Sequence, residues 1–230
     1  MNFGKNLQIL RKMTNMTQEE LAEKMSVSRQ TISKWELGSI LPEVEKLVDL
    51  SKMFNCSIDQ LLKDNMDFSN EVYSDIKLVT VEPFCYIRYE VISREPEEDA
   101  IAHMEGWAKQ LNIEKPYIIG WDFPKVSQEQ ANVFHMHGYG AALILENEQD
   151  ISDIDTEIFN QSRQKYIMIT LEEVKGAEFT VIPNAYKALL TYMATNGIKE
   201  KHDSTILSCY EHEYFDDKGG KFMDIYIAIE

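Results

Sequence analysis

Two short amphipathic segments joined by a tight turn, within residues 17–36, constrain this chain more than any other feature. Thr17 and Glu20 fit the capping-box pattern that begins a helix, because each side chain can bond the backbone N–H of the other residue. Apolar residues then recur at helical spacing as far as Met25, and Ser28 can cap a second helix soon afterwards. The pattern therefore predicts two helices that pack against each other across a short turn.

The second of these helices has one apolar and one polar face. Ile32 and Trp35 are expected to point inward, whereas the polar face carries side chains that donate hydrogen bonds. Arginine is suited to guanine edges, glutamine to adenine edges, and lysine to phosphates. We therefore expect this face to contact double-stranded DNA through Arg29, Gln30, Ser33 and Lys34.

Residues 3–63 resemble the phage-repressor (XRE-type) helix-turn-helix family. The family pattern Thr-Gln-Glu-x-Leu-Ala, followed by Val-Ser-x-x-Thr-Ile-Ser-x-Trp-Glu, is present without a gap in residues 17–36. The resemblance implies an all-α, five-helix domain that binds operator DNA, whereas a plain five-helix bundle without this role is the alternative. It implies that Gln18 contacts a phosphate, that Arg29, Gln30 and Lys34 face bases, and that Thr31 or Ser33 helps to position the backbone. Ser28 completes the expected DNA-binding set. A homodimer on a two-fold symmetric operator is expected, because a single small module rarely provides enough affinity and specificity alone.

The net charge of -16 is distributed unevenly along the chain. Residues 1–66 hold nine basic and nine acidic side chains, whereas the remainder holds 14 basic and 30 acidic ones. The segment expected to bind DNA is therefore neutral overall, and a local basic patch can still contact phosphates. The expected members of this patch are Lys5, Arg11, Lys12, Arg29 and Lys34.

Composition predicts a cytoplasmic protein without metal or cofactor. No segment has the roughly 18 apolar residues of a membrane span, and the N-terminus lacks the apolar core of a signal peptide. The three cysteines, at positions 56, 85 and 209, show neither disulfide-framework nor zinc-site spacing. His135 and His137 lack the further ligands that a metal site needs, so a loop pair is expected there.

The pattern changes after a polar linker, which divides the chain into a helix-turn-helix domain at residues 1–66, a linker at 67–75 and a second domain at 76–230. The second domain repeats one order of elements. Strands are expected at 76–92, 117–121 and 139–146 around a helix at 97–111, and then a strand pair or bent strand at 166–182, a helix at 184–196 and strands at 206–214 and 222–229. This order predicts an α+β domain of two β-α-β-β units that share an antiparallel sheet, with a cleft between the halves.

The second domain resembles the GyrI-like effector-binding domain, which is found alone or fused to helix-turn-helix modules in multidrug-sensing regulators. The resemblance lies in residues 116–124 and 176–183, and in Tyr210-Glu211 and residues 223–229, which match the family's Phe-Glu and Asp-Ile-Tyr-Ile-Pro-Ile. It implies that Glu211 faces a ligand in the cleft. A carboxylate among aromatic rings suits an aromatic or lipophilic cation. The ring candidates are Tyr89, Trp107, Trp121, Phe134, Tyr139, Tyr186, Tyr210 and Tyr214.

Three functions fit these observations. The first is a DNA-binding transcription regulator whose activity a small-molecule effector modulates. The second is a hydrolase, in which Glu211 acts as a general base beside Tyr210 or Tyr214. The third is a protein-interaction module of the topoisomerase-inhibitor kind. The attached DNA-binding helices favour the regulator, so we expect no enzyme and no catalytic residues, while activation and repression stay equally open.

Overall fold

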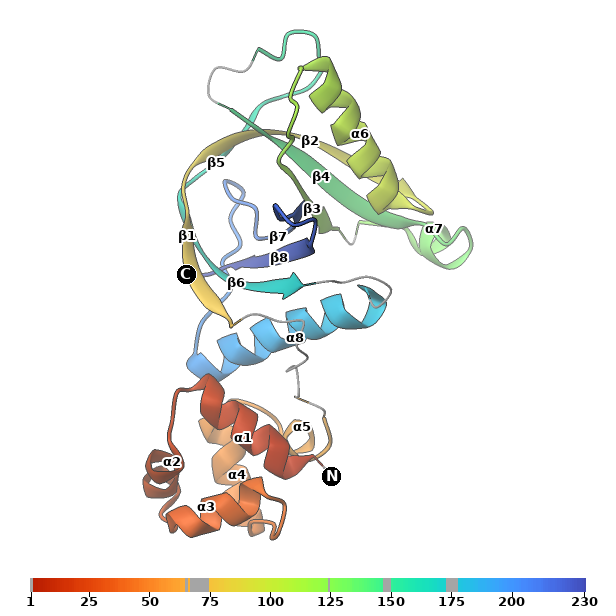
Figure 1. Ribbon diagram of the computed structural model, residues 1–230. Coiled ribbons are helices and arrows are strands. Elements are labelled where there is room, and N and C mark those ends of the chain that lie inside the picture. Colours follow the sequence, from red (N-terminus) through yellow and green to blue (C-terminus); the bar gives the residue numbers. More distant parts are fainter. Residues whose placement is uncertain (1, 65, 67–74, 124, 147–149, 173–177) are drawn as a thin grey trace. The chain divides into compact units, whose positions relative to one another are not determined.

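The computed structural model describes residues 2–64, 66, 75–123, 125–146, 150–172 and 178–230 (Figure 1). Contacts divide the chain into two compact units. The first unit comprises Met1–Ser74, Val174–Lys199 and Glu230, and the second comprises Asp75–Glu173 and Glu200–Ile229. The expected linker at residues 67–75 lies almost entirely outside the described residues, so the proposed domain boundaries stay a prediction.

Five helices begin the first unit: α1 (Phe3–Met13), α2 (Gln18–Met25), α3 (Arg29–Glu36), α4 (Val44–Met53) and α5 (Ile58–Lys63). Their inward side chains form one core, which confirms the predicted five-helix, all-α region. The fully or almost fully buried members include Leu7, Leu10, Leu21, Ile32, Trp35, Leu50 and Leu61. Removing these apolar groups from water is the main source of stability for so small a bundle.

Local hydrogen bonds fix the ends of α2 and α3. Thr17 Oγ1 accepts a bond from the Glu20 N–H at 3.1 Å, and Glu20 Oε2 accepts one from the Thr17 N–H at 2.7 Å, which confirms the predicted capping box. Ser28 Oγ accepts a bond from the Thr31 N–H at 3.1 Å. Between the two helices Ser26 has a left-handed φ of 53°, which ends α2 and turns the chain toward α3.

This capping box predicts a pH-dependent contribution to stability. Hydrogen bonds from Thr17 hold the pKa of Glu20 below its usual value. A lowered pKa adds stability that is present above the unfolded pKa of about 4.3 and is lost as pH falls through the folded value. We therefore expect Glu20→Gln to lower the thermal unfolding temperature at pH 6 and to have a smaller effect at pH 3. Thermal scans at both pH values, with Glu19→Gln as the control, would contradict this if both shifts were equal.

The first unit also contains helix α8 (Glu178–Asn196), which ends before Gly197, at a positive φ of 65°. This end was predicted correctly, but the expected strand as far as residue 182 is wrong, because those residues already belong to the helix. Their β-branched side chains before Pro183 favour a strand, yet this proline removes only one backbone hydrogen bond from the helix. Residues 176 and 177 of the matching segment lie outside the described residues.

The second unit is built on an eight-stranded antiparallel sheet in the order β1-β6-β8-β7-β3-β4-β2-β5. The strands are β1 (Lys77–Val81), β2 (Phe84–Ser93), β3 (Ile118–Asp122), β4 (His137–Leu145), β5 (Phe159–Gln161), β6 (Gln164–Glu172), β7 (Cys209–Phe215) and β8 (Lys221–Ala228). In chain order each half reads β-α-β-β, with α6 after β2 and α8 after β6, as predicted. The two halves meet at one register pair, Gly120 opposite Glu211.

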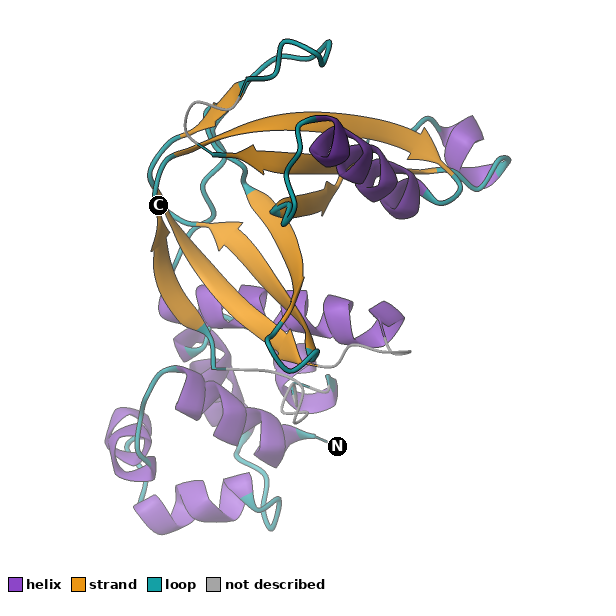
Figure 2. Ribbon diagram, turned by 45° about the horizontal axis from the view of Figure 1, so that its top comes forward, coloured by secondary structure: helices purple, strands orange, loops and turns teal. Residues whose placement is uncertain are grey.

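Helix α6 (Pro96–Gln110) lies across β2 and β4 and covers one face of the sheet, called the α6 face below (Figures 1 and 2). Paired residues on neighbouring strands share a face, whereas successive residues on one strand alternate between faces. The α6 face carries Ile87, Tyr139, Ala141 and Leu143, packed against Met104 of α6. The other face, called the opposite face below, carries Tyr86, Ile119, Trp121, Tyr166 and Tyr210.

Three details of the sheet unit differ from the prediction. The expected strand at residues 76–92 is two strands, because Pro83 lacks a backbone donor and the chain there leaves the β6 side of the sheet for the β4 side. Helix α7 (Gln128–Asn132) was missed, although Ser127 and Gln130 form a capping box that the sequence contains. Strand β5 was missed because three residues are too few for a periodic pattern.

Candidate DNA-binding and ligand-binding sites

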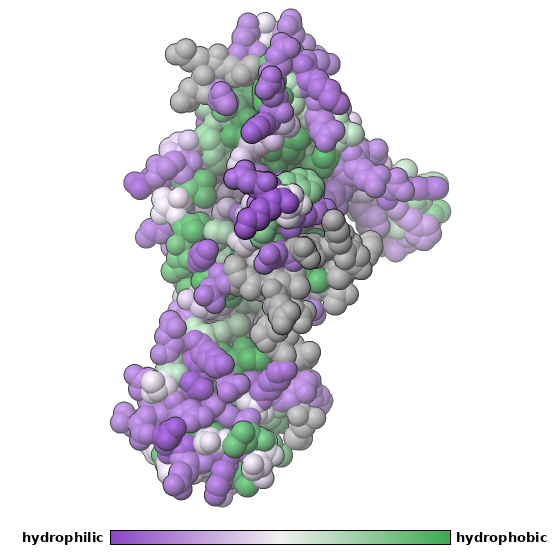
Figure 3. Space-filling model, in the orientation of Figure 1, coloured by the Kyte–Doolittle hydropathy of each residue, from purple (hydrophilic) through white to green (hydrophobic). Residues whose placement is uncertain are grey.

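Helix α3 presents three exposed side chains that can donate hydrogen bonds. Arg29, Gln30 and Lys34 are exposed, whereas Ile32 and Trp35 are buried on the inward side of the helix. Gln30 and Lys34 are four residues apart and are therefore neighbours on the helix surface. The visible surface of the five-helix region is mostly hydrophilic (Figure 3). This arrangement can offer donors to base edges and phosphates together, although the contacts with DNA stay a prediction.

Two hydroxyl-bearing residues of the predicted DNA-binding set, Ser28 and Thr31, bond to each other within the protein. Ser28 Oγ lies 2.9 Å from Thr31 Oγ1 and also accepts the Thr31 N–H, so both side chains hold the first turn of α3. Thr31 and Ser33 are half-buried. Ser28 and Thr31 therefore stabilise the start of the helix, and the DNA contacts expected of Ser28, Thr31 and Ser33 stay predictions.

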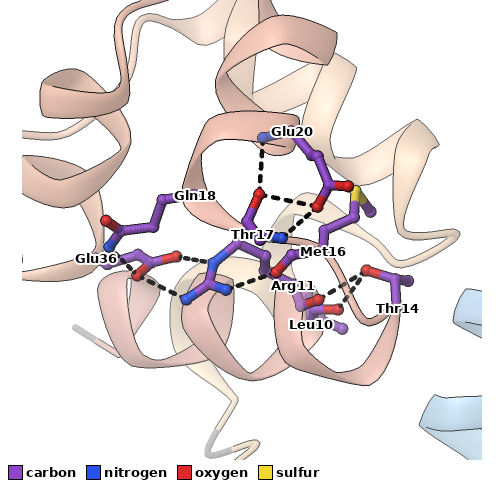
Figure 4. Close-up of polar contacts among 8 residues, drawn as sticks. All are labelled: Leu10, Arg11, Thr14, Met16, Thr17, Gln18, Glu20 and Glu36. Atoms are coloured by element: carbon purple, nitrogen blue, oxygen red, sulfur yellow. Dashed lines mark hydrogen bonds and ion pairs between the residues drawn. The ribbon is translucent and has the colours of Figure 1, made fainter.

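A buried ion pair joins α1 to α3 (Figure 4). Arg11 Nε and Nη2 donate to the two carboxylate oxygens of Glu36 at 2.6 and 3.2 Å, and these side chains are only 11% and 3% exposed. Arg11 Nη1 also donates to the Met16 carbonyl at 2.7 Å. The guanidinium is therefore satisfied inside the domain. The assignment of Arg11 to the phosphate-contacting patch was wrong, because its charge is already paired.

Gln18, the first residue of α2, is part of the same network. Its Nε2 donates to Glu36 Oε2 at 2.8 Å (Figure 4). An amide nitrogen carries two hydrogens, so this bond leaves the second one to meet an anion at the helix N-terminus. The predicted phosphate contact of Gln18 is compatible with this geometry and stays a prediction.

Glu211 and Tyr139 mark a candidate ligand site at the centre of the α6 face. Glu211 is half-buried on β7 and lies opposite Gly120, where the two halves of the sheet meet. A side chain at Gly120 would collide with the Tyr139 hydroxyl, so Tyr139 reaches across β3 from its place on β4. Burial and then the charge of Glu211 raise the pKa of Tyr139. The phenol is therefore neutral at physiological pH and can donate a hydrogen bond.

Further carboxylates make the surroundings of Tyr139 acidic. Glu97 in the first turn of α6, Asp122 on β3 and Glu213 on β7 each add to the rise in the pKa of Tyr139. Asp122 is the register partner of Tyr139, whereas Glu213 pairs with Lys221 at 2.8 Å. Several negative charges near one point on the surface favour the approach of a cation. The surface around Tyr139 can therefore attract positive ligands.

Aromatic rings form a wall between β2 and α6. The rings of Tyr89 and His103 stack with centroids 3.8 Å apart and an interplanar angle of 9°. Trp107 meets His103 edge to face at 4.6 Å. Burial lowers the pKa of His103, which keeps the imidazole neutral at physiological pH. His103 was not among the predicted site residues, although its spacing of four residues from Trp107 in the expected helix signalled a shared face.

The structure divides the predicted ligand-binding residues among several places. Glu211, Tyr139, Tyr89 and Trp107 belong to the α6 face and the helix that covers it. Trp121 is one residue from Gly120 on β3, and Tyr210 and Tyr214 are one and three residues from Glu211 on β7. Residues at an odd spacing along a strand lie on opposite faces, so these three side chains belong to the opposite face. Phe134 lies after α7, where its carbonyl accepts a bond from Arg94 Nε at 3.3 Å, and Tyr186 lies on α8 in the first unit.

Three further properties hold for the part of the chain that the structure describes. Within it, no group of three or more histidine, cysteine, aspartate or glutamate side chains could hold a metal ion. Its three cysteines are free thiols and half-buried. None of its helices is long and apolar enough to cross a membrane.

Comparisons with known proteins identify the N-terminal region. A family model described as helix-turn-helix matches residues 7–61. The HTH-type transcriptional activator BcrR of Enterococcus faecalis is 52% identical over 62 residues, which are 27% of this chain and 30% of BcrR. The uncharacterized HTH-type transcriptional regulator MJ0272 of Methanocaldococcus jannaschii is 38% identical over 55 residues, which are 24% of this chain and 83% of MJ0272.

The crystal structure of the EcmrR C-terminal domain has a TM-score of 0.48 with this chain, at 11% identity over 68% of this chain and 97% of that one.

The chain spans less than a third of the length of BcrR but most of the length of MJ0272. Both relatives are named as transcription regulators, and the family match runs from within α1 to within α5. The chain therefore belongs to the XRE-type helix-turn-helix family, through the helix-turn-helix domain in residues 7–61.

Proposed function

We propose that the protein is an effector-responsive transcription regulator. In this proposal a homodimer binds operator DNA through α3, and a small aromatic or lipophilic cation at the Glu211–Tyr139 site changes that binding. The observation that carries the proposal is the presence, in one chain, of a helix-turn-helix domain and an acidic, aromatic site at the centre of a separate sheet.

The DNA-binding part of the proposal rests on the exposed face of α3. Arg29 and Gln30 are at the start of the helix, where residues of a recognition helix contact base edges in the major groove. Lys34 is one turn further along and is assigned to phosphate. One such helix reads few base pairs, so two copies on a two-fold symmetric operator supply the affinity and specificity that a regulator needs.

The ligand-binding part rests on the chemistry around Glu211. Its carboxylate supplies a counter-charge, and the neutral phenol of Tyr139 can donate a hydrogen bond across the seam of the sheet. Tyr89 and Trp107 offer aromatic rings, whose faces attract cations. A partly desolvated carboxylate strengthens this attraction, because Coulomb forces are larger in a medium of low dielectric constant. An organic cation with aromatic groups satisfies all of these features.

The two sites can be linked only if the ligand discriminates between states of the protein. A ligand that binds two arrangements equally well shifts neither, whereas differential binding changes the affinity for DNA by the same factor as DNA changes the affinity for the ligand. Activation and repression both follow from this scheme, depending on which arrangement the ligand favours.

A titration with two isosteric ions of opposite charge tests the ligand site. We expect tetraphenylphosphonium to quench the tryptophan fluorescence of the full chain saturably, and tetraphenylborate to cause no saturable change. Glu211→Gln should raise the dissociation constant for tetraphenylphosphonium about tenfold or more, because it removes the counter-charge but keeps the shape of the side chain.

Glu82→Gln is the matched control, since Glu82 is an exposed carboxylate of the same unit and pairs with Arg163 at 3.1 Å. It should leave the dissociation constant within about twofold of the unmodified protein, a change of less than 0.5 kcal/mol. Equal weakening by both variants would reduce the role of Glu211 to general electrostatics, and no weakening by Glu211→Gln would refute the site.

A further inference from the structure

A cavity of about 610 Å³ lies inside the first unit, between α8 and the corner that joins α4 to α5. Small-molecule sites usually have volumes of roughly 300–1,000 Å³, so this cavity is large enough for a ligand. Phe54 and Met66, both part of the five-helix core, line one wall. Leu190 and Thr191 of α8 line the other. One wall of the cavity therefore has an apolar part, and the other, from α8, carries both apolar and polar side chains.

Two amide side chains join α8 to the five-helix region near this cavity. Asn55 Nδ2, in the turn between α4 and α5, donates to the Ala194 carbonyl in the last turn of α8 at 3.2 Å. Asn196 Nδ2, at the end of α8, donates to the Met13 carbonyl at the end of α1 at 3.2 Å. The last carbonyls of a helix lack partners within that helix, so these two amides satisfy carbonyls at the ends of α8 and α1. A molecule in the cavity would thus lie beside the polar contacts that join α8 to the five-helix region.

The lining of the cavity favours an uncharged occupant. Its two charged groups, Lys187 and Asp64, have opposite signs and cancel. Burial raises the pKa of the Cys56 thiol to about 11, so this group is neutral at physiological pH. The other polar lining groups are amides and hydroxyls, such as Asn184 and Thr191, which bond neutral partners. Apolar and neutral polar walls of this kind suit a flat aromatic molecule with few hydrogen-bonding groups.

We propose that this cavity is a second small-molecule site, distinct from the Glu211–Tyr139 site, and that it takes an uncharged aromatic molecule. Its occupant touches the α4–α5 corner of the five-helix region and α8 at once. Such a molecule favours the arrangement in which both walls are in contact, so it gives the protein a second input that does not depend on a cation. This cavity is independent of the Glu211 site, because none of its described lining residues belongs to the second unit.

N-phenyl-1-naphthylamine, an uncharged dye that fluoresces in apolar surroundings, is the probe for this site. We expect saturable binding to the full chain at one site. Ala194→Trp places a large side chain in the cavity wall and should weaken binding about tenfold or more. Ala102→Trp, on the exposed side of α6, is the matched control and should leave the affinity unchanged, as should Glu211→Gln. Saturable binding that Ala194→Trp does not weaken, or the absence of saturable binding, would overturn the proposal.

A second measurement does not depend on the folding of a variant with a new tryptophan. Cys56 lines the cavity, so an occupant should shield it from alkylation. In a Cys85→Ser/Cys209→Ser background, saturating dye should slow the reaction of Cys56 with iodoacetamide by about fivefold or more, as expected when most molecules are occupied. An unchanged rate in the presence of bound dye would show that the dye binds elsewhere and would overturn the assignment of the cavity.

Discussion

Replacing Glu36 by alanine is expected to destabilise the DNA-binding domain by about 3–5 kcal/mol, because it leaves the buried charge of Arg11 without a partner. The two side chains are almost completely buried and share two hydrogen bonds, and Gln18 loses its acceptor in the same variant. A domain of this size has only about 5–15 kcal/mol of stability in total, so the loss would be a large fraction of it. Hydrogen exchange of the α1–α3 amides under native conditions measures the change as a lower free energy of opening.

Two further variants separate the cost of the unpaired charge from the loss of a side chain. Arg11→Met/Glu36→Leu removes both charges and should recover most of the loss, since apolar replacements of a buried ion pair are often nearly neutral. Glu23→Ala, an exposed acid on α2, should change the free energy of opening by less than about 0.5 kcal/mol. If the double variant were no more stable than Glu36→Ala, the unpaired charge would not be the cause.

Replacing Arg29 or Gln30 by alanine is expected to weaken binding to the preferred operator by about 1–3 kcal/mol, roughly 5- to 150-fold, and to relax the choice of base at one position. Both side chains are exposed at the start of α3, and neither contributes to the core, so the fold should be retained. Selection from a random duplex library defines the operator, and fluorescence anisotropy at fixed salt then measures each dissociation constant.

Lys34→Ala should act differently from these two variants. Loss of one phosphate contact weakens binding to all sequences alike and lowers the slope of log affinity against log salt by about 1. Lys52→Ala, which removes the same charge from α4, is the matched control and should change neither specificity nor slope. Unchanged affinity, specificity and salt dependence in all of the α3 variants would refute the proposed docking of this helix.

Much of the DNA-binding domain could be predicted because its signals are local. The bonds between Thr17 and Glu20 span three residues, and the cap of α3 at Ser28 is equally short. The pair of Arg11 with Glu36 spans 25 residues, and no local rule connects these positions. Arg11 was therefore assigned to the surface on its charge alone, whereas the fold uses that charge inside.

The candidate ligand site was predicted less well, and part of the reason was available in the sequence. Tyr210 and Glu211 are consecutive on a strand, so they could not face the same side of a sheet. The relation of Gly120 to Tyr139 could not be predicted in this way, because it depends on which strands become neighbours. The start of α8 was missed since β-branched residues before Pro183 fit a strand as well as a helix turn.

The decisive experiment on the proposed regulation asks whether a ligand at the Glu211–Tyr139 site changes operator binding. Anisotropy titrations of the selected operator, with and without saturating tetraphenylphosphonium, measure this coupling in the full chain and in Glu211→Gln. We predict that the ligand shifts the operator dissociation constant of the unmodified protein by about fivefold or more, in either direction, and that it causes no shift in Glu211→Gln. An unchanged dissociation constant in the unmodified protein, at a ligand concentration that saturates the fluorescence signal, would contradict the proposal that this protein is an effector-responsive regulator.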